Sequence, residues 1–115
     1  MEFRRPTVDE QRLLLELARI ARIDDPQRWL NALQVREMTD GGMGSLALTV
    51  TAQKAVDSGG VLLPKASVQF ADEDGVLVVA TLNASVDGLP FELDIWKTDF
   101  TPLKRIPTSF QRIAD

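Results

Sequence analysis

Leu89 to Pro102 reads LPFELDIWKTDFTP, and apolar and polar side chains alternate along its first half. Such alternation is typical of a β-strand that lays one face against a hydrophobic core. The apolar side chains share one face: Phe91, Leu93 and Ile95. The opposite face carries two carboxylates and an indole: Glu92, Asp94 and Trp96. We therefore expect an extended backbone here, with a second face that either meets solvent or binds another molecule.

The composition predicts one globular α+β domain over residues 1–115. The chain has 115 residues, of which 44% are hydrophobic, and this is enough for one core. It has no cysteine and no histidine. These absences remove thiolate nucleophiles, the commonest general base and the commonest transition-metal ligand. We expect no enzymatic activity, no catalytic residues, no cofactor and no metal site.

The N-terminal sequence resembles neither a secretory signal nor a membrane anchor. Met1 to Pro6 is not followed by an apolar segment with a small-residue cleavage site. No apolar run approaches the roughly 20 residues of a membrane-spanning helix. Together with the lack of cysteine, this predicts a soluble, unprocessed cytoplasmic protein that does not bind membranes.

The formal net charge of −4 is unevenly distributed. Between positions 66 and 100, Lys97 is accompanied by seven acidic residues: Asp72, Glu73, Asp74, Asp87, Glu92, Asp94 and Asp99. An acidic surface repels phosphate backbones and attracts basic proteins. We therefore expect no binding to nucleic acid and a basic protein as partner.

Two helices are predicted at the start of the chain. A capping box formed by Thr7 and Glu10 precedes leucines at helical spacing, which predicts a helix over about 8–23. Asp25 and Pro26 then form a typical start for a second, short helix. Together the two helices present one amphipathic layer that needs a sheet to cover.

Alternating segments separated by glycine-containing turns predict the strands. These segments lie near 34–38, 45–53, 66–71, 76–83 and 89–97, with a brief strand at 61–63 as an alternative within a loop. The predicted fold is two N-terminal helices packed on a four- to five-stranded, mostly antiparallel sheet. The end of the chain, 108–113, is either a short helix or a loose tail.

Val76 to Leu82 is apolar on both faces, although two helices cover only one face of a sheet. Either the sheet curls over itself, or the C-terminal tail crosses it, or a second chain covers it. The last option makes a homodimer an alternative organisation.

Two short motifs invite functional interpretations. Asp40 to Ser45 reads DGGMGS, which resembles a phosphate-binding loop but lacks its lysine and precedes a strand instead of a helix. Asp72 to Gly75 reads DEDG, which resembles a calcium loop but places its glycine two positions early. We interpret the first as a tight connection and the second as a hairpin turn.

The order of three motifs resembles a family of small bacterial proteins described as a domain of unknown function. The motifs are DGGMGSL at 40–46, DEDGV at 72–76 and FELDIWKTDFTP at 91–102. The resemblance extends from Arg5 to Pro107. It implies a complete unit but assigns no activity and no catalytic residues.

The leading hypothesis is a non-enzymatic protein-binding module, and its most concrete form is an immunity-type inhibitor that binds a basic toxin through an acidic sheet face. The candidate contact residues are Glu92, Asp94, Trp96, Asp99, Asp72 and Asp74. Two alternatives remain: a small-ligand or metal-assisted hydrolytic protein that uses Glu92 and Asp94, and a structural homodimer. Trp96 is either a contact residue or ordinary core beneath Phe100, Pro102 or the tail.

Overall fold

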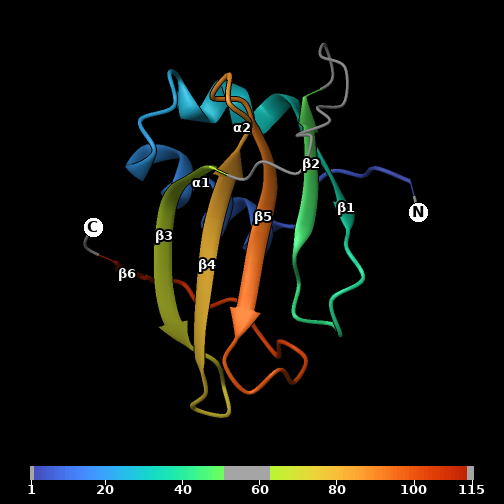
Figure 1. Ribbon diagram of the computed structural model, residues 1–115, viewed down its shortest axis with the longest axis vertical. Helices are drawn as coiled ribbons and strands as arrows, with labels where there is room; N and C mark the ends of the chain where they lie inside the picture. The colour runs from blue at the N-terminus through green and yellow to red at the C-terminus, as the bar shows by residue number, and fades with distance from the viewer. Residues whose placement is uncertain (1, 51–62, 114–115) are drawn as a thin grey trace.

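The computed structural model describes residues 2–50 and 63–113 of the chain. In these residues two helices are followed by six strands, which form one antiparallel sheet in the order β1-β2-β5-β4-β3-β6 (Figure 1). The elements are α1 (Val8–Ile20), α2 (Pro26–Ala32), β1 (Leu33–Glu37), β2 (Leu46–Val50), β3 (Leu63–Ala71), β4 (Leu77–Ala84), β5 (Pro90–Lys97) and β6 (Gln111–Arg112). The α+β class is confirmed.

The prediction of four to five strands is wrong, because the described residues contain a sixth. β6 is only two residues long and pairs with Val68 and Gln69 of β3. So short a strand has no alternation of its own to recognise, and only its partner strand makes it extended. The expected short helix or loose tail at 108–113 is therefore replaced by a brief edge strand. Residues 61–62 of the alternative strand lie outside the described residues, whereas Leu63 begins β3.

Both helices begin where their capping signals predict. The backbone N–H of Glu10 donates to Oγ1 of Thr7 at 3.2 Å, and the N–H of Thr7 donates to Oε1 of Glu10 at 2.8 Å. The Asp25 carboxylate accepts the N–H of Arg28 at the start of α2. α1 ends three residues earlier than predicted, and Arg22 just after it adopts a left-handed backbone with φ of 58°.

The end of α2 is capped from a distant part of the chain. Nη1 of Arg5 donates to the carbonyl oxygens of Leu30 and Asn31, at 2.8 and 3.1 Å. Carbonyls in the last turn of a helix lack partners within the helix, and a cation there also interacts favourably with the helix dipole. Arg5 thus links the N-terminal segment to the end of α2, where β1 begins.

The core lies between the helices and one face of the sheet. In Figure 1 the strands face the viewer and α1 passes behind them. Buried residues of α1 and α2 form one cluster with buried residues of the strands, among them Leu13, Leu17, Leu30, Val68, Val78, Leu93 and Ile95. None of the helices in the described part of the chain is long and apolar enough to cross a membrane.

The opposite face of the sheet, which we call the outer face, carries Leu77, Val79 and Thr81 of β4 and Glu92, Asp94 and Trp96 of β5. The tail does not cross it. Instead, the carbonyl of Pro107 accepts a hydrogen bond from Nε of Arg12 on α1, and Phe110 packs edge-on against the buried Phe70. The tail therefore packs on the helix side, and Leu77 on the outer face remains 43% exposed.

Candidate functional site

β5 places its side chains as the alternation predicts. Leu93 and Ile95 are 0% and 1% exposed, whereas Asp94 and Trp96 are exposed on the outer face. Phe91, near the start of the strand, is only half-buried. β5 lies between β2 and β4 in the middle of the sheet. β4 pairs with β5 along its length and β2 pairs with it at Glu92 and Leu93, so the backbone that carries the outer-face side chains is held in place.

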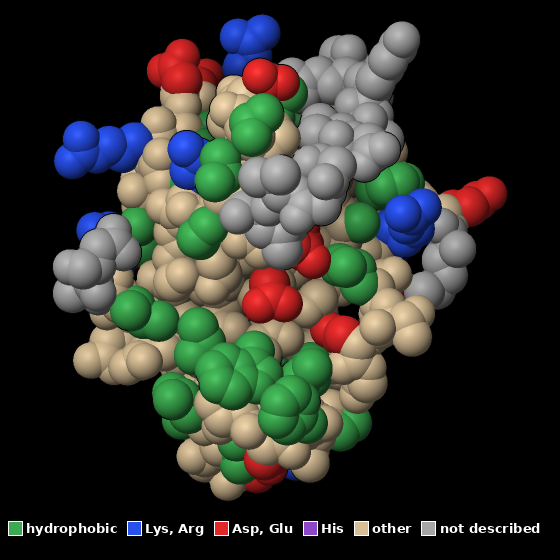
Figure 2. Space-filling view, viewed as in Figure 1, with side chains coloured by type: hydrophobic (Ala, Val, Ile, Leu, Met, Phe, Trp, Pro, Cys, Tyr) green, Lys and Arg blue, Asp and Glu red, His purple; other side chains and the backbone are tan. Residues whose placement is uncertain are grey.

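Trp96 is a surface residue and not core. The residue is 44% exposed, and its only ring contact in the described structure is with Phe100, at 6.3 Å between centroids and 52° between planes. Phe100 is 68% exposed and adopts a left-handed backbone with φ of 64°. Figure 2 looks onto the outer face, where hydrophobic side chains gather toward one end of β4 and β5. Bulky residues rarely adopt positive φ, so an exposed Phe100 there has a conformational cost.

Acidic side chains lie on the outer face beside this hydrophobic cluster (Figure 2). Glu92 accepts a hydrogen bond from Nδ2 of Asn83 at 3.2 Å. Asp94 forms no hydrogen bond or ion pair with any residue in 2–50 or 63–113. Its pKa is raised, first by partial burial and then by repulsion from the Asp40 carboxylate. Within the described residues, the Asp94 carboxylate is therefore an anion without a compensating cation.

Lys97 occupies the next core-facing position after Ile95, and its side chain is completely buried. Nζ lies 2.6 Å from Oδ2 of Asp74, 2.9 Å from Oδ2 of Asp72 and 3.2 Å from the carbonyl oxygen of Pro102. An ammonium group has three protons, so all three are satisfied. Burial alone would lower the pKa of Lys97, but the hydrogen bonds from Lys97 to the two aspartates raise it.

Asp72 is the most heavily bonded of the carboxylates that we describe. Its oxygens accept the backbone N–H groups of Glu73, Lys104 and Arg105, at 2.7, 2.8 and 3.1 Å. Burial works to raise its pKa, but these bonds and the one from Lys97 outweigh it and lower the pKa to about 2. For Asp74, the bond from Lys97 is the main reason that the pKa is lowered.

The six predicted contact residues are therefore not brought together. Glu92, Asp94 and Trp96 share the outer face, as alternation requires. Asp72 is buried, and with Asp74 it neutralises Lys97. Asp99 is exposed after β5, but its carboxylate accepts two bonds from Thr101, which lower its pKa. Phe100 was not among the predicted contact residues. The structure adds it to the candidate site because its ring lies next to that of Trp96.

The glycine loop at 40–45 packs against the segment that follows β5. The backbone N–H of Leu103 donates to the carbonyl of Gly42 at 3.0 Å. Gly42 has φ of 81°, and a Cβ there would lie 3.3 Å from Cβ of Pro102. The Asp40 carboxylate closes the loop by accepting the N–H groups of Met43 and Ser45. The loop is thus a tight connection, as predicted, and its contacts show why it contains glycine.

All three motifs that carried the family resemblance meet at this end of the sheet. The loop at 40–46 and the hairpin turn at 72–76 both contact residues between 97 and 105. A family model for a domain of unknown function (DUF6984) matches residues 3–107. The chain belongs to this family. Neither the comparison with curated proteins nor the comparison with solved structures found a match.

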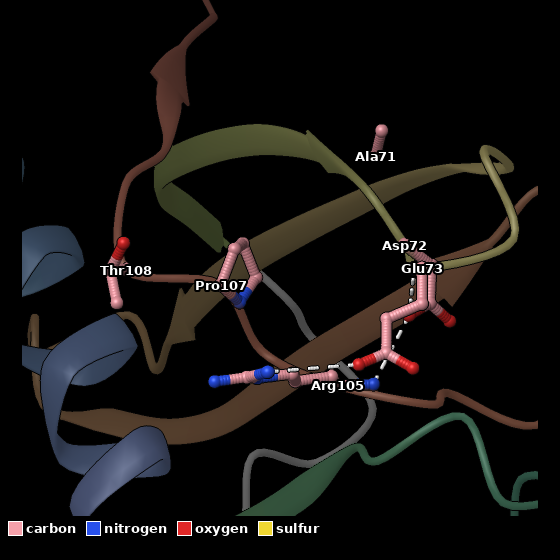
Figure 3. A pocket seen from close by; sticks show the side chains of 6 residues that line it. All are labelled: Ala71, Asp72, Glu73, Arg105, Pro107 and Thr108. Atoms are coloured by element: carbon pink, nitrogen blue, oxygen red, sulfur yellow. Dashed lines mark hydrogen bonds and ion pairs between the residues drawn. The ribbon is translucent and has the colours of Figure 1, made fainter.

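The DUF6984 chain also has a shallow pocket of about 260 Å³ beside the hairpin turn (Figure 3). It is lined by Ala71, Asp72, Glu73, Arg105, Pro107 and Thr108. Figure 3 marks the ion pair between Arg105 and Glu73, with 3.8 Å between Nη1 and Oε1. The charged groups of this pocket therefore face partners within the chain, and in the described residues no three potential ligands cluster to hold a metal ion.

Proposed function

We propose that this DUF6984 protein is a non-enzymatic binding module that recognises a basic protein through the outer face of its sheet. One observation carries the proposal: Trp96 and Phe100 remain exposed next to each other, and Trp96 shares the outer face of β5 with Asp94, whose charge no described residue neutralises. Tryptophan is over-represented among residues that dominate binding energy, and unpaired carboxylates steer and orient a cationic partner.

The composition of the face supports a protein partner. Leu77 lies on the same face and at the same end as Trp96, and it is 43% exposed. A hydrophobic cluster bordered by polar groups is typical of protein interaction sites. The acidic border disfavours phosphate-rich ligands. It also disfavours a homodimer with its twofold axis through this face, because Asp94 and Glu92 would then meet their own copies.

We propose a basic toxin as the concrete partner, which would make the protein an immunity-type inhibitor acting in the cytoplasm. In such a complex the carboxylates would occupy a toxin site that otherwise binds phosphate groups. The absence of cysteine suits a reducing compartment. We therefore expect a neighbouring gene to encode a basic toxic protein, and we expect this protein to suppress its toxicity.

The experiment is to express the neighbouring gene products with this protein and to measure binding and growth. Asp94→Lys and Trp96→Ala each should reduce affinity at least about tenfold, since both remove a central contact. Val86→Ala is the matched control, because Val86 is 71% exposed in the turn before β5, at the other end of that strand. Unchanged binding and growth protection by both face variants would refute the proposal.

A further inference from the structure

The Trp96 and Phe100 rings form an open wedge on the outer face. Their centroids are 6.3 Å apart and their planes are inclined by 52°. Trp96 and Phe100 are 44% and 68% exposed, so solvent reaches both residues. A ring face is electron-rich and attracts cations, most strongly in tryptophan.

The wedge is built by the fold and is not a chance contact of loose side chains. Trp96 belongs to a central strand. Phe100 follows in a tight turn, in which its backbone N–H donates to the carbonyl of Lys97 at 2.8 Å. The buried ion cluster of Lys97 and Asp72 anchors the turn from below, and Nζ of Lys97 also bonds the carbonyl of Pro102.

Holding Phe100 in this position does not favour folding. Its left-handed backbone is unfavourable for a bulky residue, and Phe100 gains little from burial because it is 68% exposed. Strain of this kind persists where the surrounding structure enforces it, and it is found at binding sites. The position of Phe100 is therefore explained better by recognition than by stability.

A carboxylate lies beside the wedge. Asp94 is two residues before Trp96 on the same face of β5, and alternate residues on a strand are about 7 Å apart. Asp94 has no hydrogen-bonding or ionic partner in the described residues, whereas Asp99 on the other side is bonded to Thr101. A guanidinium group stacked on the indole would have its N–H groups within reach of Asp94.

We propose that Trp96, Phe100 and Asp94 form a recognition site for one arginine side chain of the partner. This inference rests on the proposed function, and it specifies which residue of the partner protein the outer face binds. Arginine fits better than lysine because its planar guanidinium stacks on an aromatic ring and still donates two parallel hydrogen bonds to a carboxylate.

The test uses N-acetylarginine amide as the probe and the indole N–H resonance of Trp96 in the full chain as the readout. Trp29, the other tryptophan, is the internal reference. We expect a saturable shift of Trp96 alone, with a Kd at least about fivefold lower than for N-acetyl-lysine amide and tenfold lower than for the citrulline amide, which has the same shape without charge.

Variants separate the contributions of the three residues. Asp94→Asn should raise the Kd for the arginine probe at least about fivefold, and Phe100→Leu should raise it about threefold. Asp87→Asn is the matched control, because Asp87 is an exposed aspartate at the other end of β5, and it should leave the Kd unchanged. The remaining backbone resonances check that each variant is folded.

Each of the following outcomes would overturn the inference: no shift of Trp96 with the arginine probe, equal affinity for the arginine and citrulline amides, or no effect of Asp94→Asn on the Kd. A Trp96 shift that grows with protein concentration alone would overturn it too, because it would identify a second copy as the occupant. Tight binding of N-acetylnorleucine amide at Trp96 would also overturn it, but would leave a protein-binding face intact. If Trp96→Ala abolished partner binding but the wild-type protein showed no preference for the arginine probe, the protein-binding face would stand and the arginine site would fail.

Discussion

Nζ of Lys97 lies 2.9 Å from Oδ2 of Asp72, and both side chains are completely inaccessible to solvent. The pair joins the end of β5 to the hairpin turn between β3 and β4. Through the backbone N–H groups of Lys104 and Arg105, Asp72 also holds the segment after β5. One buried ion pair therefore connects the hairpin turn to the end of β5 and to the segment that follows β5.

Lys97→Met should destabilise the protein strongly, because it leaves the buried Asp72 without its cation. We expect the melting temperature to fall by roughly 10–20 °C. The double variant with Asp72→Asn should be closer to wild type than the sum of the two single losses, since neither charge is then left alone. Lys104→Met, at an exposed lysine, is the control and should change the melting temperature by less than about 2 °C. Equal losses in Lys97→Met and Lys104→Met would show that the pair contributes little.

Acid should weaken the protein through Asp72. Its pKa is lowered to about 2 in the folded chain, below the ordinary aspartate value of about 3.9. A lowered pKa contributes stability that is fully present above the unfolded value and is lost as pH falls toward the folded value. Urea midpoints at pH 7, 4 and 2.5 should therefore fall more steeply for wild type than for Asp72→Asn. If the urea midpoints of the two proteins fell equally with pH, other carboxylates would be responsible for the loss of stability in acid.

Gly42→Ala tests the packing of the glycine loop against a matched glycine. Gly42 and Gly88 have nearly equal φ, 81° and 83°, but only Gly42 has a neighbour where Cβ would be, Pro102 at 3.3 Å. Both alanine variants should lose about 1–2 kcal/mol of unfolding free energy from the left-handed backbone. Gly42→Ala should lose more, because Pro102 must also move. Urea denaturation measures both losses, and a larger loss in Gly88→Ala would contradict the packing explanation.

Local patterns predicted the elements because each depends on nearby residues. The capping box of Thr7 and Glu10 needs two residues three positions apart, and alternation in β5 needs only its own side chains. β6 was missed because its extended backbone depends on β3, more than 40 positions earlier.

The candidate site was only partly predictable for the same physical reason. Alternation identifies the face of Trp96 and places Lys97 with Leu93 and Ile95, but it does not say what covers either residue. A lysine at a core position requires carboxylates, and Asp72 and Asp74 supply them from the preceding hairpin. Their negative charge therefore placed those two aspartates on the predicted binding surface, whereas in the structure they pair with the buried Lys97.

Asp94→Asn should stabilise the protein at neutral pH, in contrast to Asp72→Asn. The pKa of Asp94 is raised in the folded chain, so the charged form is less favourable there than in the unfolded chain. Wild type therefore loses stability as pH rises through the range in which Asp94 ionises, and the neutral variant does not. We expect a melting temperature higher by roughly 1–3 °C at pH 7 and no difference at pH 3. A variant that is less stable at pH 7 would indicate that the Asp94 carboxylate has a structural partner.

Phe100→Asn should separate stability from recognition at the wedge. Asparagine tolerates a left-handed backbone much better than phenylalanine, so the variant should gain about 0.5–1 kcal/mol of unfolding free energy in urea denaturation. Phe100→Leu keeps the unfavourable backbone and is the matched control, for which we expect no gain. Both variants remove the ring, so both should weaken binding of N-acetylarginine amide. A loss of stability in Phe100→Asn relative to Phe100→Leu would mean that the ring of Phe100 packs as structure, and that its exposure beside Trp96 has no functional cause.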